Sequence, residues 1–169
     1  LEHHPSLCAF PALESIDLQK NPLRELPDGI WDHPRLERIC LGGHGMELGE
    51  VPEAGLSLRE LRLDGMGLDR LPLSALGSPS MLDTLSLKGN NIGQLGKDLG
   101  SLSGLRNLFL SENPLESLPK EIGGLTGLRE LFLNRTRLRS LPQELTRLAD
   151  LELLSLPFSS LETLPEAIG

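Results

Sequence analysis

One segment of the chain, LRNLFLSENPLESLPKEIGGLTG at residues 105–127, is copied along the whole sequence. The copies align on the template LxxLxLxxNxLxxLPxxIxxLxx and recur every 22 to 24 residues, beginning at Leu13, Leu36, Leu58, Leu82, Leu105, Leu128 and Leu151. This repetition constrains the fold more than any other feature. A single unit cannot bury its own apolar edge, so it needs a copy on each side to form a core.

The alignment divides the chain into one partial repeat and seven further repeats. Residues 7–12 match residues 30–35 in register, so residues 1–12 are expected to be the back half of a preceding or N-terminal capping repeat. Residues 13–169 then form the seven repeats of one solenoid domain. Neither end carries a polar capping segment, which a terminal repeat normally needs for solubility. We therefore expect the chain to be part of a longer protein.

Each repeat begins with the alternating pattern LxxLxL, which predicts a short β-strand. The fourth and sixth positions should point into the core, and the third, fifth and seventh should point outward. Strands stack about 4.8 Å apart, so equivalent residues should form columns along one sheet. The asparagine at the ninth position can satisfy backbone groups where the chain leaves the strand. The LP pair then begins a short helical turn, because a proline there removes no needed N–H.

The period, the leucine positions, the asparagine and the LP pair together resemble the leucine-rich repeat over essentially the whole chain. The form LPxxI at residues 26–30, 118–122 and 164–168 is similar to the intracellular repeats of Ras-group-related plant and animal proteins. It also resembles repeat domains of bacterial type III effectors. The resemblance implies an α/β fold, a right-handed horseshoe with a parallel concave sheet of about seven short strands and short helical or 3-10 turns on the convex side.

The repeats are least regular in the second and third copies. The ninth position reads Asn21, His44, Met66, Asn90, Asn113, Thr136 and Ser159. Threonine and serine keep part of the hydrogen bonding of asparagine, whereas methionine keeps none. Residues 42–57 form either a bulged loop on degenerate repeats or a contact loop beside the sheet. Trp31, on the outer path, either covers the edge of an early repeat or binds a ligand.

No motif for catalysis or metal binding stands out. Residues 42–45 (GGHG) lack the lysine and hydroxyl of a phosphate-binding loop. The four histidines have no ligand spacing, so we expect surface or turn positions for His3, His4, His33 and His44. Residues 100–104 miss the GxSxG elbow by register. We expect no enzymatic activity, no cofactor and no metal within these residues. The resemblance leaves room for a separate catalytic domain, such as a ubiquitin ligase or nucleotidyltransferase, outside them.

The charge and cysteine content limit the partners and the compartment. The 24 acidic residues outnumber the 16 basic ones and give a formal net charge of -8, which argues against nucleic acid and anionic membranes. No apolar run approaches the roughly 18 residues of a membrane span. Cys8 and Cys40 are expected on opposite sides of the solenoid, so they should be free thiols. Two cysteines favour a reducing compartment, and we expect a cytoplasmic protein, in the host cytosol if it is an injected effector.

The outward columns of the predicted sheet change character along the chain. The third-position column runs Ser15, Arg38, Glu60, Thr84, Asn107, Glu130 and Leu153. The fifth-position column runs Asp17, Cys40, Arg62, Ser86, Phe109, Phe132 and Ser155. The template asks for no apolar residue at these places. The C-terminal half nevertheless carries two neighbouring phenylalanines, whose rings should point at solvent.

Clustered apolar groups rimmed by charge mark interaction sites, and aromatic residues beside arginine are typical of binding hot spots. The predicted protein-binding residues are Phe109, Phe132, Leu153, Phe158, Arg106, Arg129 and Arg135. The alternative is that the two aromatic rings only pair across strands and stabilise the sheet.

The sequence thus favours a protein–protein interaction module, a monomer that recognises a partner or substrate protein through its concave face. We expect a fragment of a larger cytosolic or host-injected effector protein. The alternative is an extracellular or cell-surface recognition module of a receptor.

Overall fold

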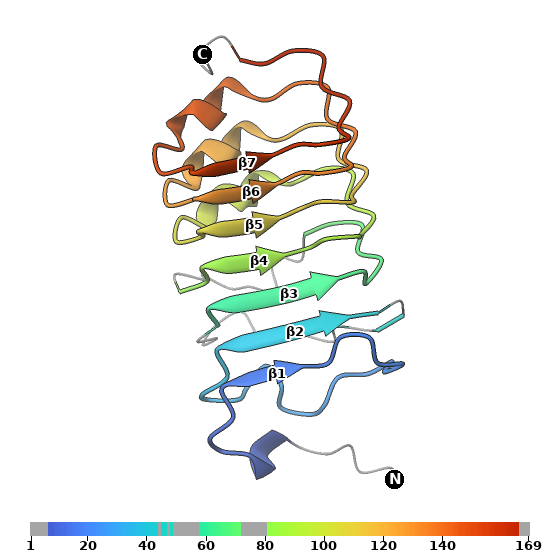
Figure 1. Cartoon of the computed structure of the whole chain (residues 1–169). Coiled ribbons are helices and arrows are strands. Elements are labelled where there is room, and N and C mark those ends of the chain that lie inside the picture. The colour runs from blue at the N-terminus through green and yellow to red at the C-terminus, as the bar shows by residue number, and fades with distance from the viewer. Residues whose placement is uncertain (1–6, 44, 47, 49–57, 72–80, 166–169) are drawn as a thin grey trace.

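The chain is a solenoid built on one parallel sheet. The computed structural model describes residues 7–43, 45, 46, 48, 58–71 and 81–165. Its seven strands lie in sequence order and pair in parallel throughout (Figure 1). They are β1 Ser15–Asp17, β2 Arg38–Gly42, β3 Glu60–Asp64, β4 Thr84–Ser86, β5 Asn107–Phe109, β6 Glu130–Phe132 and β7 Leu153–Ser155. The predicted α/β solenoid is confirmed.

Short 3-10 turns occupy the return path behind the sheet (Figure 1). They are η1 Leu7–Ala9, η3 Lys97–Ser101, η4 Lys120–Gly124 and η5 Gln143–Arg147. Pro119 and Pro142 stand one residue before η4 and η5, in extended backbone. A Cβ atom placed on Gly123 would lie 2.7 Å from the carbonyl oxygen of Glu144. Neighbouring turns therefore pack at a distance that only glycine allows.

The core is a stack of inward-pointing columns, as the alternation predicts. The fourth-position residues of the five inner strands are at most 1% exposed: Ile39, Leu61, Leu85, Leu108 and Leu131. Their counterparts in the end strands, Ile16 and Leu154, are only partly buried. Each end strand has a neighbour on one side only within the described residues, so one flank of its side chain stays uncovered.

The ninth-position asparagine of the fourth repeat links two repeats. The Nδ2 group of Asn90 donates to the carbonyl oxygens of Leu63 and Leu87, both at 2.8 Å. Its Oδ1 accepts from the backbone N–H groups of Met66 and Leu68, both at 3.0 Å. Met66 contributes no hydrogen bond from its own side chain, and the next asparagine satisfies its backbone instead. The predicted bonding role of the asparagine is confirmed here.

The last two repeats bond differently at the same position. The Thr136 hydroxyl donates to the carbonyl oxygen of Leu133 at 2.9 Å, and the Ser159 hydroxyl donates to that of Leu156 at 2.8 Å. Both acceptors belong to the same repeat as the donor. His44, and with it residues 47 and 49–57 of the irregular loop, lies outside the described residues, so both interpretations of that loop stay predictions.

Two side chains near the N-terminus serve the fold. His33 is 9% exposed, and its Nε2 lies 3.1 Å from the carbonyl oxygen of Phe10 while its Nδ1 accepts from the N–H of Arg35. The tautomer with its hydrogen on Nε2 satisfies both contacts. His33 is buried between two turns, so of the expected surface or turn positions the surface one is wrong for it. Trp31 donates from Nε1 to the carbonyl oxygen of Leu48 and packs against the core, which is the covering role.

Candidate protein-binding site

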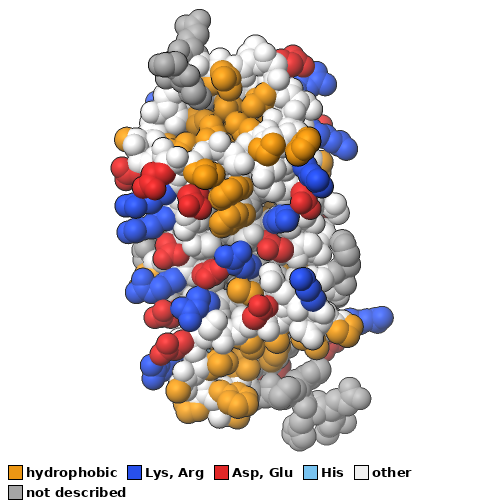
Figure 2. Space-filling view, viewed as in Figure 1, with side chains coloured by type: hydrophobic (Ala, Val, Ile, Leu, Met, Phe, Trp, Pro, Cys, Tyr) orange, Lys and Arg blue, Asp and Glu red, His pale blue; other side chains and the backbone are white. Residues whose placement is uncertain are grey.

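The strand register assembles the two outward columns on one face. Asn107 pairs with Glu130 and Glu130 with Leu153, which continues the third-position column. Phe109 pairs directly with Phe132 in the fifth-position column. Figure 2 shows an apolar group over β5 and β6 on this face, with acidic and basic side chains on both sides of it.

The two phenylalanine rings stack face to face. Their centroids are 4.8 Å apart and their planes differ by 10°. The sequence predicts rings that point at solvent, and both residues are half-buried, so part of each ring is covered and part is open. Stacking covers part of each ring and leaves the remainder open.

Arg62 extends the aromatic stack towards the N-terminus. Its guanidinium carbon lies 5.7 Å from the centroid of Phe109, and its Nε donates to the carboxylate of Glu60. Arg62 belongs to β3 and Phe109 to β5, with Ser86 of β4 between them. Ser86 is small and turns its hydroxyl to Asp64, so an arginine from two strands away reaches the ring. The sequence-based prediction missed Arg62, although the fifth-position column contains the signal.

A second aromatic group stands at the strand exit. Phe158 follows β7 and is 80% exposed. The guanidinium carbon of Arg135, which follows β6, lies 5.7 Å from the centroid of its ring. Cation–π contacts of this kind contribute roughly 0.5–1 kcal/mol at exposed sites. Phe158 and Arg135 therefore contact each other in spite of their exposure.

Both residues occupy the eighth position of their repeats, where the backbone is left-handed in every repeat. The φ angles there are positive at Lys20, Gly43, Gly65, Gly89, Glu112, Arg135 and Phe158. Glycine adopts this conformation readily, whereas other L-residues lose roughly 1–2 kcal/mol in it. Phe158, with a φ of 60°, is a bulky residue held in a conformation that suits glycine.

The aromatic pair and the strand-exit residues enclose a cleft of about 440 Å³, which we call the aromatic cleft. Of the predicted site residues, Phe109, Phe132, Arg135 and Phe158 line it. Pro157, Arg62, Asp64, Ser86, Lys88, Ser111, Glu112 and Asn134 complete the lining.

The other three predicted residues lie beside the aromatic cleft. Leu153 is 40% exposed at the end of the third-position column. Arg106 and Arg129 stand immediately before β5 and β6, at the opposite end of the strands from Arg135. The Nη1 atom of Arg129 forms an ion pair with Glu152 at 3.3 Å. The structure thus brings four of the seven predicted residues together and places three at the periphery.

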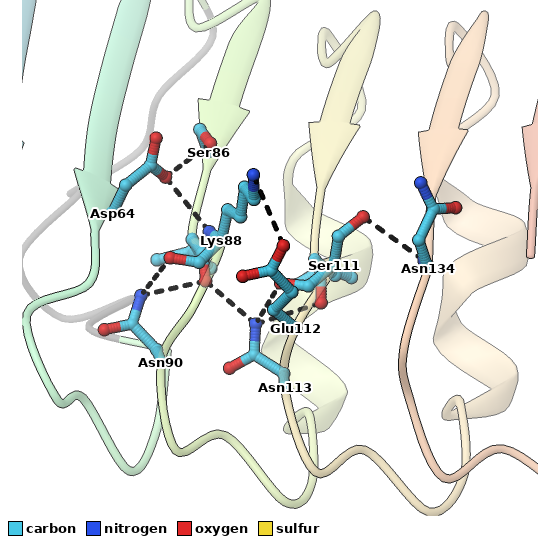
Figure 3. A network of polar contacts seen from close by, with 10 residues as sticks. Asp64, Ser86, Lys88, Asn90, Ser111, Glu112, Asn113 and Asn134 are labelled. Carbon is cyan, nitrogen blue, oxygen red and sulfur yellow. Dashed lines mark hydrogen bonds and ion pairs between the residues drawn. The ribbon is translucent and has the colours of Figure 1, made fainter. Parts of the chain in front are cut away.

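A polar network fixes the side of the cleft nearest β3 and β4 (Figure 3). The Oδ1 atom of Asp64 accepts from the Ser86 hydroxyl at 2.6 Å and from the Lys88 N–H at 3.0 Å. The Nζ atom of Lys88 lies 3.4 Å from Oε1 of Glu112. Arg135 has no ion pair with any residue in the described part of the chain. Among the three basic residues that line the cleft, it is therefore the one without an ion pair to a described residue.

Cys40 lies outside the aromatic cleft, in the fifth-position column between Asp17 and Arg62. It is a half-buried free thiol. Burial raises the pKa of this thiol, and the carboxylates of Glu60 and Asp17 raise it further. A raised pKa means that the neutral, unreactive form persists at a pH where an ordinary cysteine has ionised.

Alkylation of Cys40 is therefore expected to have its midpoint at a higher pH than alkylation of a free cysteine, which ionises near pH 8.5. The measurement is the iodoacetamide rate between pH 7 and 10.5 in a Cys8→Ser variant, in which Cys40 is the remaining thiol. The urea-unfolded chain, where the burial and the carboxylates are removed, is the control. A midpoint equal to or below that of the unfolded chain would contradict the expectation.

Across residues 7–43, 45, 46, 48, 58–71 and 81–165, no three histidine, cysteine or carboxylate side chains are grouped to hold a metal ion. Over the same residues, no helix has the length and apolar character to cross a membrane.

Comparison with known proteins gives one family. A family model for the leucine-rich repeat matches residues 104–125. A solved leucine-rich repeat protein of Leptospira interrogans has a TM-score of 0.88 and 33% identity, over 96% of this chain and 42% of that chain. Human 5T4, the trophoblast glycoprotein, has a TM-score of 0.71 and 25% identity, over 92% of this chain and 66% of that chain.

The functional domain of InlJ from Listeria monocytogenes has a TM-score of 0.58 and 20% identity, over 87% of this chain and 33% of that chain. At this identity the similarity concerns the fold alone. The chain spans less than two thirds of each of these three proteins. The similarities therefore concern the solenoid, and the activities of the longer proteins are not transferred to this chain.

Proposed function

Since the chain is a leucine-rich repeat protein, we propose that it binds another protein through the C-terminal half of its concave face. Leucine-rich repeat domains generally bind other proteins. The observation that supports this part of the face is the stacked pair Phe109 and Phe132, which stays half-open at positions where the fold needs no apolar residue. The other fifth-position residues are charged or small, so the solenoid forms without aromatic rings there.

Stabilisation of the sheet accounts for the aromatic pair only in part. A cross-strand aromatic pair contributes roughly 0.2–1 kcal/mol. Phe158 makes no such pair, and it is 80% exposed in a left-handed backbone conformation. Residues kept in unfavourable backbone conformations cluster at functional sites. Binding explains both aromatic groups together, with Leu153, Arg106 and Arg129 as the periphery of the same surface.

We propose no catalytic activity for these residues, so that any catalysis would belong to a separate domain. We place the chain in a larger cytosolic or host-injected protein, a proposal supported by the low cysteine content and by the similarity to a bacterial leucine-rich repeat protein. The second candidate is a recognition module of a cell-surface receptor, which the similarity to the human trophoblast glycoprotein favours. Fractionation of cells that express the native gene, with an antibody against the solenoid, separates the two.

The double variant Phe109→Ala/Phe132→Ala is expected to weaken binding of the partner by about 2 kcal/mol or more, roughly thirtyfold in Kd. The reason is that the substitutions remove both aromatic side chains from the centre of the proposed contact surface. The partner is first isolated by affinity capture on the native chain, and its Kd is then measured by calorimetry beside the thermal midpoint of each variant.

The matched control is Asp17→Ala/Cys40→Ala, which empties two adjacent places in the same column at the other end of the sheet. It should leave the Kd unchanged. If the aromatic double variant keeps its affinity and loses thermal stability instead, the pair is structural and the proposal fails.

A further inference from the structure

The aromatic cleft has an apolar floor, an apolar wall and a polar wall. The rings of Phe109 and Phe132 form an apolar floor, and Pro157 with Phe158 forms an apolar wall at the strand exit. The second wall is polar and comes from β3, from β4 with Lys88 beyond it, and from Ser111 and Glu112 beyond β5. The volume of about 440 Å³ lies low in the range of ligand sites, roughly 300–1,000 Å³. The cleft therefore has room for one or two side chains.

The strand-exit wall is held in place by backbone geometry. Phe158 has a φ of 60° and Arg135 a φ of 56°, while three earlier repeats have glycine at the equivalent place. A glycine at this place has no side chain to line the cleft, whereas phenylalanine or arginine places a large side chain at its edge. The C-terminal repeats thus build a wall at a position where the backbone alone favours glycine.

The charges of the lining are satisfied, with one exception. Arg62 bonds to Glu60, and Lys88 forms an ion pair with Glu112. Asp64 accepts from Ser86 and from the backbone N–H of Lys88 (Figure 3). Arg135 has the ring of Phe158 beside it and no carboxylate among the described residues. A guanidinium that lies over a ring keeps its N–H donors available at its edge, where a carboxylate binds with two bonds.

We propose that the aromatic cleft receives an apolar side chain of the partner with an aspartate or glutamate directly beside it. The apolar side chain packs on Phe109, Phe132 and Phe158, and the carboxylate binds Arg135. This inference rests on the proposed function and adds the chemistry of the partner segment. The partner segment is thus acidic and apolar. This differs from the expectation set by the formal charge of -8, because a net negative protein repels acidic partners in general.

The test is a selection from a displayed library of random heptapeptides, carried out in parallel on the native chain and on Phe109→Ala/Phe132→Ala. The native chain is expected to enrich peptides that contain an apolar residue next to Asp or Glu, and the double variant is expected not to enrich them. The best peptide is then synthesised with a fluorescein label, and its Kd is measured by anisotropy. Replacing its acid by the matching amide should weaken binding about tenfold, which corresponds to 1.4 kcal/mol.

Charge reversal supplies the complementary measurement. Arg135→Glu should weaken the acidic peptide at least tenfold and improve a version of it with lysine in place of the acid. The matched control is Arg137→Glu, which makes the same charge change two residues away, at an exposed residue that does not line the cleft. It should change the Kd less than twofold.

Phe158→Gly separates recognition from folding. Glycine relieves the strain of the left-handed backbone at a φ of 60°, which offsets the greater freedom that it gives the unfolded chain. The thermal midpoint should therefore stay the same or rise, while the Kd of the labelled peptide should increase about tenfold. A lower midpoint together with an unchanged Kd would show that Phe158 is structural, and the inference would be wrong about this wall.

The outcomes distinguish the inference from the proposed function. Enrichment of apolar residues beside lysine or arginine overturns the acidic chemistry and leaves protein binding by the aromatic face intact. Absence of any peptide that depends on Phe109 and Phe132 overturns the inference that a short segment fills the cleft. The proposed function itself fails only if the native partner binds the aromatic double variant as tightly as the native chain.

Discussion

Asn113→Ala is expected to lower the free energy of unfolding by about 3 kcal/mol, since buried groups left without a partner cost roughly 1–3 kcal/mol each. Asn113 is 2% exposed. Its Nδ2 donates to the carbonyl oxygens of Leu87 and Leu110, both at 2.9 Å, and its Oδ1 accepts from the N–H of Ile92 at 3.1 Å. Alanine leaves the carbonyl oxygen of Leu110 and the N–H of Ile92 without these bonds in two adjacent repeats, whereas the carbonyl oxygen of Leu87 keeps its bond from Nδ2 of Asn90. Urea unfolding followed by circular dichroism measures the change.

Asn21→Ala is the matched control, because Asn21 holds the same template position at the exposed end of the sheet. Its Nδ2 donates to the carbonyl oxygens of Leu18 and Gln19, both at 3.2 Å. Water can replace an exposed amide, so the loss there should stay below about 0.5 kcal/mol. Equal losses in the two variants would contradict the assignment of Asn113 as a buried link between repeats.

Gly123→Ala is expected to cost about 3 kcal/mol, at the upper end of the usual range for overpacking. A Cβ there would lie 2.7 Å from the carbonyl oxygen of Glu144, 3.0 Å from its Cβ and 3.3 Å from Cδ of Arg147. The nearest atom is backbone, so relief requires η4 and η5 to move apart. Thermal and urea unfolding report the loss of stability.

Gly96→Ala controls for the general effect of replacing a glycine at a 3-10 turn, because Gly96 is the residue before η3. A Cβ at Gly96 meets no atom within 4 Å, and its φ of -72° suits any residue. Stability should stay the same or rise, because alanine restricts the unfolded chain. If both variants unfold at the same urea concentration, the turns tolerate separation and their close packing is incidental.

The sheet was predictable because its determinants are local. Each strand needs only the two-residue alternation of LxxLxL, and the stacking follows from a constant period. The adjacency of Phe109 and Phe132 follows from the same register, so the centre of the candidate site could be located in the sequence.

The boundary of the site depends on side-chain reach, which the repeat pattern does not encode. Arg62 reaches Phe109 across β4 because Ser86 is small and bonded to Asp64. Arg106 and Arg129, although close in sequence to the phenylalanines, stand at the other end of the strands. Distance along the chain is therefore a poor guide to which arginines line the cleft.

The sequence contains a signal for the left-handed eighth position, which the sequence-based prediction missed. Gly43, Gly65 and Gly89 align there in three consecutive repeats, which indicates a positive φ at that place. Applied to the later repeats, the same column places Arg135 and Phe158 in that conformation. The strained wall of the cleft was thus readable from an alignment of glycines with larger residues.

The change from asparagine to threonine and serine at the ninth position removes a side-chain link between neighbouring repeats. Asn90 and Asn113 bond carbonyl groups of the preceding repeat, whereas Thr136 and Ser159 bond only within their own. In a linear array, weaker coupling between neighbours lets a group of repeats open without the rest. A partner that spans β5 to β7 would bridge the more weakly coupled repeats, so that binding would also stabilise the surface that performs it.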